Sequence, residues 1–386
     1  MANGLSSLQR VISKKCGETM NQTAKKVLVV GGAGYVGSVL VPELLERGYA
    51  VKVFDRLYYG DQGLKDVRDR IQLEIGDMRL IPPSVLSDVD AVINLGGLSN
   101  DPTAEYNPKA NYEMNTVATE KLALLCKQAG IERFVFASSA SIYDVGEGND
   151  SRDILLDETA EVDPKAAYSR SKYEAERILL NMADAHFCPV LLRKGTVFGF
   201  SPRMRYDLVV NTFVMGALSK GLMTLHFGGE MWRPLVDVRD VAKAYITCLQ
   251  APADKVRGQI FNVVHRNYRI SELAYRIREG LRQVGVNVEI QANYRYKGVR
   301  NYRISGKKME QVLDFRPTVS VEESVVEMVE KIRAYGYNDF DNPRYYNIRW
   351  MKLLEEIDRV IKYTGSVFDW PHEDVTPGTV PWKQAA

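Results

Sequence analysis

The sequence has little of several features that mark particular classes of protein. Its few cysteines, at Cys16, Cys126, Cys188 and Cys248, have no paired spacing, which favours reduced thiols in a cytoplasmic setting and argues against a metal site. The four histidines form no ligand cluster either. A net charge of +2 gives no reason to expect nucleic acid or an anionic membrane, and no apolar run reaches the ~18 residues of a spanning helix. We therefore expect a cytoplasmic chain with no metal and with neither a nucleic-acid nor a membrane partner.

What the chain does have is a regular alternation of strand-like and helix-like runs. The strand-like runs lie at 27–30, 50–54, 71–75, 90–94, 133–138 and 189–193. This alternation predicts an α/β protein, with a Rossmann-type doubly wound parallel sheet and a smaller C-terminal substrate-binding lobe. Active sites in such an architecture form beyond the carboxyl ends of the strands.

The chain divides into four expected parts. Residues 1–24 are polar and mildly basic and lack the apolar stretch of a secretion signal, so we expect a flexible N-terminal tail. Residues 25–190 mainly form the dinucleotide-binding domain, and residues 191–334 mainly form the substrate lobe, with segments that return to the sheet. Residues 335–386 are an aromatic-rich C-terminal extension. We expect this extension to wrap the lobe or a neighbouring subunit, without a role in cofactor binding.

A glycine-rich turn follows the first strand-like run and opens a helix-like run. Gly31, Gly34 and Gly37 are spaced three apart in this turn. Glycine permits a tight turn and a close approach of the backbone to a pyrophosphate, and the helix that follows directs free N–H groups at the phosphates. The turn therefore predicts a dinucleotide-binding site, to which Tyr35 and Val36 also belong.

Acidic residues near the ends of the next two strands indicate which dinucleotide binds. Asp55 ends the second strand, at the distance where a carboxylate accepts hydrogen bonds from the adenosine ribose. Its charge would repel the 2'-phosphate of NADP, so NAD is favoured, while Arg56 could pair with that phosphate and leaves NADP as the alternative. Asp77 follows the third strand and would either read the adenine amino group or act as a simple turn aspartate. Further cofactor-binding candidates are Met78, Leu95 and Gly96.

Three residues with the chemistry for proton transfer follow the fifth strand. Ser139 lies near the end of the strand, and Tyr168 and Lys172 lie four residues apart on one face of a later helix. A phenol with an ordinary pKa of about 10 is a poor base at neutral pH, but a nearby ammonium favours the phenolate. Tyr168 can then accept the proton of a substrate hydroxyl that Ser139 holds for hydride transfer to a nicotinamide. The alternative is an exposed helix without function, but the glycine turn and the serine together favour catalysis.

On these residues the chain resembles the extended short-chain dehydrogenases that act on nucleotide sugars, the nucleoside-diphosphate-sugar epimerase/dehydratase group. The resemblance covers about residues 25–333, and its marks are the glycine turn, Asp55, the run 138–143, Tyr168 with Lys172, and the runs 193–199 and 233–242. It implies an NAD-dependent enzyme whose substrate is a nucleoside-diphosphate sugar. It also implies a homodimer in which the helices near 107–128 and 166–184 form a four-helix bundle. Apolar candidates for that contact are Leu122, Leu125, Ile178 and Leu179.

The residues after Ser139 narrow the reaction within this group. Members that remove water carry an acidic pair there, and members that epimerise carbons three and five carry a cysteine where Ser141 stands. This chain has Ala140 and Ser141. The resemblance therefore implies redox chemistry at carbon four alone. The enzyme is then either a 4-epimerase, which oxidises and re-reduces that carbon with bound NAD, or a dehydrogenase or ketoreductase that performs half of this cycle.

The predicted substrate contacts extend from the catalytic serine into the lobe. The run 195–211 looks like a subset of the group that includes GDP-heptose 4-dehydrogenases, with threonine where many epimerases have asparagine. Arginines offer guanidinium forks to a diphosphate, and an asparagine offers a two-sided amide. The predicted substrate-binding residues are Ser99, Ser139, Ser141, Thr196, Arg203, Arg205, Asn211, Arg233 and Arg303.

Two other classes of function stay open at this point. A non-catalytic dinucleotide-binding regulator could use the same fold, although such proteins typically lose the tyrosine or the lysine that this chain retains. An NADPH-dependent reductase of a small ketone or aldehyde would leave the arginines without a role. The sequence does not determine the base or the sugar of the substrate.

Overall fold

The structure of the chain is a computed structural model that describes residues 25–144, 154–294 and 300–365. The predicted N-terminal tail lies outside the described residues, as does the end of the C-terminal extension. In the described part of the chain, no helix combines the length and the apolar character that crossing a membrane requires.

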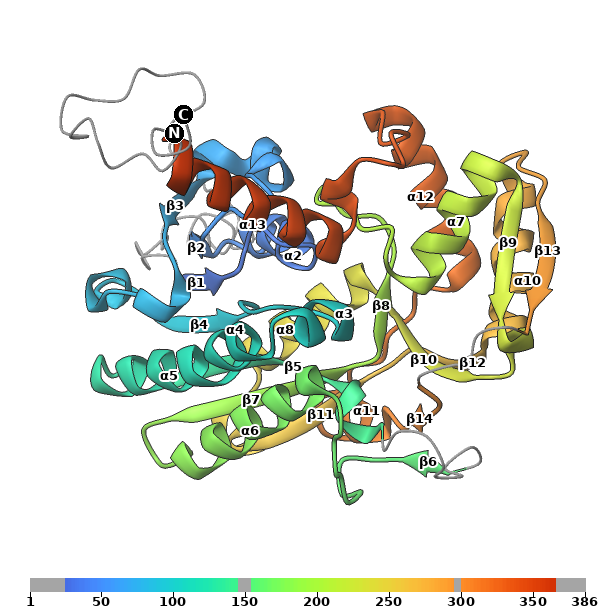
Figure 1. Cartoon of the computed structure of the whole chain (residues 1–386). Helices are drawn as coiled ribbons and strands as arrows, with labels where there is room; N and C mark the ends of the chain where they lie inside the picture. Colours follow the sequence, from blue (N-terminus) through green and yellow to red (C-terminus); the bar gives the residue numbers. More distant parts are fainter. Residues whose placement is uncertain (1–24, 145–153, 295–299, 366–386) are drawn as a thin grey trace, which may run out of the picture.

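A seven-stranded parallel sheet forms the centre of the molecule (Figure 1). Its strands, in spatial order, are β11 (Gln259–Val263), β7 (Cys188–Lys194), β5 (Arg133–Ser139), β4 (Ala91–Asn94), β1 (Lys26–Val30), β2 (Ala50–Asp55) and β3 (Ile71–Ile75). The order reverses at β1, which confirms the predicted doubly wound α/β fold. The strand β11 is not among the predicted runs, because its sequence mixes polar and apolar residues.

Helices cover both faces of the sheet and bury the alternate side chains of each strand. On one face, α2 (Gly37–Glu46) and α8 (Val238–Gln250) pack over Val27 and Val29 of β1. On the other face, α5 (Ala118–Gln128) and α6 (Ala167–Met182) pack over Leu28 and Val30. Both sides of β1 are apolar and buried, as expected for a central parallel strand.

A second hydrophobic core builds the lobe beyond the carboxyl ends of the strands. Its helices are α7 (Val209–Lys220), α10 (Ile270–Gln283) and α12 (Val321–Tyr335). Its strands are β8 (Thr196–Phe198), β10 (Trp232–Asp237) and β12 (Arg266–Arg269) in one sheet, and β9 (Leu222–His226) with β13 (Glu289–Asn293) in another. A short pair, β6 (Leu155–Leu156) and β14 (Arg303–Ile304), lies below the lobe in Figure 1.

The C-terminal extension first packs on the lobe and then crosses to the other half of the molecule. The hydroxyl of Tyr206 donates to the carbonyl of Tyr337 at 2.6 Å, and the rings of Tyr337, Phe340 and Tyr345 join the lobe core. The extension ends, within the described residues, in the long helix α13 (Asn347–Thr364), drawn in red on the side of β2 and α2 (Figure 1). The expected packing on the lobe is therefore present, whereas the return across the dinucleotide half is not predicted by the sequence.

Candidate active site

One pocket brings most of the predicted site residues together at the carboxyl ends of the strands. Its volume is about 320 Å³, and its walls come from the sheet, α6, the lobe and the C-terminal extension. Among the cofactor-binding candidates it is lined by Gly31, Gly34, Tyr35, Val36, Gly37, Asp55, Arg56, Asp77, Met78, Leu95 and Gly96. The catalytic candidates Ser139, Tyr168 and Lys172 and the substrate candidates Ser99, Thr196, Arg203 and Arg205 line the same pocket.

The glycine turn is packed so tightly that side chains would obstruct it. Gly31 has a φ of +78°, and a Cβ on it would lie 2.8 Å from the backbone nitrogen of Gly96. A Cβ on Gly37, the first residue of α2, would lie 2.3 Å from the carbonyl oxygen of Gly32. The bare backbone and the start of α2 thus face the pocket, which fits the phosphates of a dinucleotide.

Asp55 is held in place by backbone N–H groups while keeping acceptor capacity. One of its carboxylate oxygens accepts from the N–H of Ala33 at 3.0 Å, and the other accepts from the N–H of Leu57 at 2.7 Å. Burial raises the pKa of Asp55, and these two hydrogen bonds oppose that rise. Each oxygen has a further lone pair, so the carboxylate can also accept the two hydroxyls of a ribose.

Asp77 serves as a turn residue and as the ion-pair partner of Arg56. It accepts from the backbone N–H of Arg79 at 3.0 Å, and its carboxylate pairs with the guanidinium groups of both Arg79 and Arg56. Partial burial acts to raise the pKa of Asp77, but the hydrogen bonds from Arg79 outweigh it and lower the pKa. Because Arg56 is engaged by this carboxylate, it is not a free partner for a 2'-phosphate.

The catalytic candidates meet where β5 ends and α6 begins. Tyr168 and Ser139 both line the pocket, and Ser139 Oγ accepts from the N–H of Ser141 at 3.2 Å. Burial raises the pKa of Tyr168, while the positive charge of Arg300 and the hydroxyl of Ser139 act to lower it. Lys172 is 4% exposed, and burial lowers its pKa to about 8. We expect Lys172 to be the cation that stabilises the phenolate, and in the structure the positive charges of Arg300 and Arg205 also act to lower the pKa of Tyr168.

Arg300 is the main pocket residue that was not predicted from the sequence. It lines the pocket with Tyr302, and its guanidinium pairs with Asp101 and Asp144. The predicted Arg303 lies outside the pocket lining, with its guanidinium 5.0 Å from the centre of the Trp232 ring. Side chains alternate along an extended segment, so residues 300 and 302 face the pocket while residue 303 faces away.

Three further substrate candidates are also outside the pocket lining. Arg233 donates through Nη1 to the carbonyl of Trp232 at 2.8 Å and to that of Arg300, so it supports the segment that carries Arg300. Ser141 is buried in the turn after β5. Asn211 accepts from the N–H of Gly199 at 3.1 Å and donates to the carbonyl of Arg205 at 2.8 Å. Its two-sided amide therefore holds the loop 199–205 instead of a ligand.

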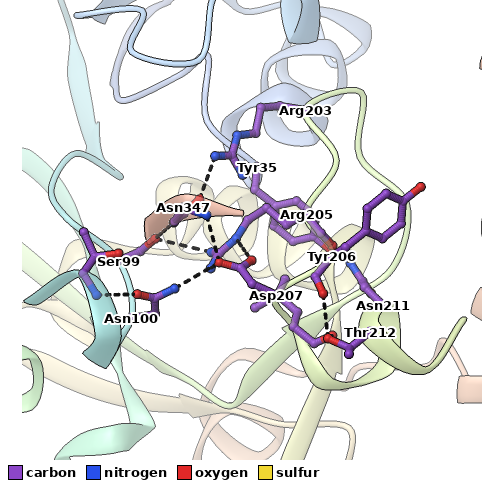
Figure 2. A network of polar contacts seen from close by, with 12 residues as sticks. Tyr35, Ser99, Asn100, Arg203, Arg205, Tyr206, Asp207, Asn211, Thr212 and Asn347 are labelled. Atoms are coloured by element: carbon purple, nitrogen blue, oxygen red, sulfur yellow. Dashed lines mark hydrogen bonds and ion pairs between the residues drawn. The ribbon is translucent and has the colours of Figure 1, made fainter. Parts of the chain in front are cut away.

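A polar network joins that loop to the dinucleotide half and to the C-terminal extension (Figure 2). Arg205 forms an ion pair with Asp207 at 2.8 Å and donates to Ser99 Oγ at 3.3 Å. Asn347, the first residue of α13, donates to Ser99 Oγ at 2.8 Å and accepts from Arg203 Nη2 at 2.7 Å. The sequence gives no signal that an asparagine some 140 residues further along would join these arginines.

Comparisons with known proteins agree with this geometry. Residues 27–263 match the family model described as the NAD dependent epimerase/dehydratase family. The chain is 31% identical over 230 residues to the sterol-4-alpha-carboxylate 3-dehydrogenase, decarboxylating, of Mus musculus, a match that covers 58% of this chain and 59% of that relative. The chain therefore spans about three fifths of the length of this relative. The UDP-N-acetyl-alpha-D-glucosaminuronate decarboxylase of Bacillus cytotoxicus is 25% identical, over 80% of this chain and 98% of the relative.

A solved structure shares the fold over most of this chain. The structure of MoeE5 in complex with UDP-glucuronic acid and NAD has a TM-score of 0.69 and 25% sequence identity, and it covers 80% of this chain and 99% of that chain. About a fifth of this chain therefore lies outside the part that this structure covers.

Proposed function

Because the chain belongs to the NAD dependent epimerase/dehydratase family, we propose that it acts at carbon four of a nucleoside-diphosphate sugar, as a 4-epimerase. The family membership confirms the predictions of an enzyme and of NAD as its cofactor. The observation that supports the proposal is a single pocket that holds the glycine turn, Asp55 and the Ser139, Tyr168 and Lys172 set.

The chain's own residues supply the acid and base chemistry of this reaction. Ser139 holds the substrate hydroxyl on carbon four, and the phenolate oxygen of Tyr168 accepts the proton of that hydroxyl as the carbon is oxidised. Bound NAD supplies the hydride acceptor. Lys172 and Arg300 place positive charge around the phenol, which favours its deprotonated form. An epimerisation would be completed by return of the hydride to the opposite face of carbon four, and Tyr168 would then return its proton to the oxygen on that carbon.

The positions of the carboxylates in the pocket favour redox chemistry at one carbon over elimination of water. Among the described lining residues, the only carboxylates are Asp55 and Asp77. Both lie on the cofactor side and are engaged by backbone N–H groups or arginines. Elimination of water would need an additional acid and base next to Ser139, where Ala140 and Ser141 follow.

Two alternatives use the same residues with a different outcome. A 4-dehydrogenase or 4-ketoreductase would stop after half of the cycle. A decarboxylase would oxidise carbon four of a sugar that carries a carboxylate on the neighbouring ring carbon. The resulting β-keto acid would lose carbon dioxide, and the enolate that remains would take up a proton. The names of the Mus musculus and Bacillus cytotoxicus relatives favour including such sugars in the test. A non-catalytic dinucleotide-binding regulator is the alternative of another class.

The decisive experiment incubates the protein with NAD and a panel of UDP-, GDP-, CDP- and dTDP-linked sugars, including uronic acids. Inversion at carbon four by NMR without net NADH supports the epimerase. Accumulation of NADH supports the dehydrogenase, and release of carbon dioxide supports the decarboxylase. Tyr168→Phe is the control, because it removes the proton acceptor and keeps the ring. If no nucleotide sugar is turned over or protects the protein against unfolding, the proposed substrate class is wrong.

We also propose that the chain forms a homodimer in the cytoplasm, through the helices near 107–128 and 166–184. Leu122 and Leu179 are fully buried inside the subunit, so these two of the four expected residues are not available for that contact, whereas Leu125 and Ile178 are only partly buried. Exposed apolar residues on the same helices are Tyr112, Val117 and Leu124. The three cysteines in the described part of the chain are buried free thiols, which is compatible with a reducing compartment.

A further inference from the structure

Arg203 is a buried cation whose hydrogen bonds are incomplete. It is 7% exposed and lines the pocket, and its Nη2 donates to Asn347 Oδ1 at 2.7 Å. Its Nε and Nη1 are buried without an acceptor in the described part of the chain. Its neighbour Arg205, in contrast, has the carboxylate of Asp207 as an ion-pair partner at 2.8 Å. A buried guanidinium with unpaired donors is costly unless an anion binds there, so the site is built for a negatively charged ligand.

The position of Arg203 indicates whether it contacts an anionic group of the cofactor or of the substrate. Its guanidinium lies 3.6 Å from the ring centre of Tyr59, in the loop that follows Asp55, and its positive charge acts to lower the pKa of Asp55. A Cβ built on Gly63 would touch both the Cβ of Arg203 and the Oγ of Ser38, the second residue of α2. Arg203 is therefore on the cofactor side of the pocket, next to the start of α2.

The loop that carries Arg203 is also tied directly to the glycine turn. The hydroxyl of Tyr35 donates to the carbonyl of Gly199 at 2.6 Å, and Ser201 Oγ donates to the carbonyl of Tyr35 at 2.7 Å. The backbone that precedes Arg203 thus lies against the glycine turn, whose N–H groups face the phosphates. The free donors of Arg203 complement those N–H groups from the lobe side.

The C-terminal extension fixes Arg203 in this place. Asn347 is 4% exposed, and its backbone N–H donates to Asp207 at 3.1 Å while its side chain bridges Ser99 and Arg203 (Figure 2). Further along α13, Trp350 Nε1 donates to the carbonyl of Tyr58, and Met351 lines the pocket. The helix is thus anchored on both sides of the pocket.

We infer that Arg203, oriented by Asn347 of the C-terminal extension, binds the pyrophosphate of the dinucleotide and not that of the nucleotide sugar. This assignment moves Arg203 from the predicted substrate set to the cofactor set. It rests on NAD binding and deepens the proposed function. A cofactor held by the glycine turn on one side and by the lobe and α13 on the other leaves slowly, as a cycle that returns the hydride to the same carbon requires.

The test compares ligands that contain or lack phosphate, on protein freed of bound nucleotide. Calorimetry measures the affinity of NAD, ADP and adenosine for the native protein, Arg203→Met, Asn347→Ala and the control Arg349→Ala, which removes an exposed arginine from the same helix. Arg203→Met should weaken NAD and ADP about tenfold or more, since charge-assisted bonds to phosphate are lost. Adenosine affinity should stay unchanged. Asn347→Ala should give a smaller loss and a faster release of NAD, and Arg349→Ala should change neither.

Thermal unfolding of the nucleotide-free proteins separates binding from folding. Removal of an unpaired buried charge should leave the midpoint of Arg203→Met unchanged or raised. A lower midpoint together with weaker binding of adenosine would mean that Arg203 is structural. Loss of affinity for UDP, GDP, CDP or dTDP with unchanged affinity for NAD would assign the arginine to the substrate and overturn the inference. None of these measurements uses turnover of a sugar, so a wrong reaction assignment would not affect them.

Discussion

The buried ion pair beneath the catalytic residues gives the sharpest test of how the site is supported. Glu176 lies on α6, one turn after Lys172, and its carboxylate meets the guanidinium of Arg193 on β7 at 2.7 and 3.0 Å. The two side chains are 1% and 4% exposed. Ser138 donates to the same carboxylate at 2.5 Å, and Arg193 also donates to the hydroxyl of Tyr143 at 2.9 Å. The pair thus connects α6 to the ends of β5 and β7.

Removing one partner of this pair should destabilise the protein strongly. In Glu176→Gln the positive charge of Arg193 stays buried without a counter-charge, a change that typically costs about 3–5 kcal/mol of the free energy of unfolding. Glutamine keeps one acceptor oxygen for Ser138 or Arg193, so the lower part of that range is expected. The negative charge of Glu176 also opposes the effect of burial on Lys172, so the substitution should lower the pKa of Lys172 further.

A double-mutant cycle in urea measures both the size and the origin of this effect. The variants are Glu176→Gln, Arg193→Met and the double variant. The control is Glu174→Gln on the same helix, since Glu174 forms no ion pair within the described part of the chain. The double variant should lose less stability than the sum of the single variants, because it leaves no unpaired charge. Losses that add within about 0.5 kcal/mol, or a loss below about 1 kcal/mol for Glu176→Gln, would refute the reasoning.

Three further outcomes are expected. Tyr168→Phe should lower turnover by about 10²–10⁴ with nearly unchanged NAD affinity, as measured by kinetics and titration, since only the proton acceptor is removed. Turnover within threefold of native would contradict its role. Asp55→Ala should narrow the preference for NAD over NADP, and a native protein that binds NADP more tightly would show that Arg56 decides the cofactor instead. Leu124→Glu should shift the mass in light scattering from dimer to monomer, whereas the same change at the exposed Ile75 on β3 should leave it unchanged.

Local patterns in the sequence were enough to place the cofactor-binding candidates in one pocket. The glycine turn and Asp55 lie within one strand, helix and strand unit, so their spacing alone determines where they meet. The carboxyl ends of parallel strands bring Ser139 to the same edge, and the first turn of α6 brings Tyr168 to it. In such an architecture, correct strand assignments place these residues without knowledge of distant contacts.

The substrate half was predicted less well because its residues act through distant contacts. Arginine side chains are long, and residue type alone does not distinguish a ligand contact from a support for the backbone. Arg233 supports the backbone, because its position on β10 lets its guanidinium donate to the carbonyls of Trp232 and Arg300. Asn211 supports the backbone, because both ends of its amide form hydrogen bonds with the loop 199–205. The missing information in both cases was the path of a neighbouring loop.

The C-terminal extension shows how a segment beyond residues 27–263, which match the family model, can still line the pocket. Its aromatic side chains indicated only that it packs against another part of the protein, and in the structure they pack against the lobe core. The functional consequence comes from where this packing leaves the next residue. With Tyr345 fixed against Tyr206, α13 begins with Asn347 within reach of Ser99 and Arg203. Packing on the lobe therefore positions the polar contact between Asn347 and Arg203. A substitution in the aromatic cluster around Tyr206 and Tyr345 should consequently weaken the affinity for NAD more than it lowers the rate of the chemical step.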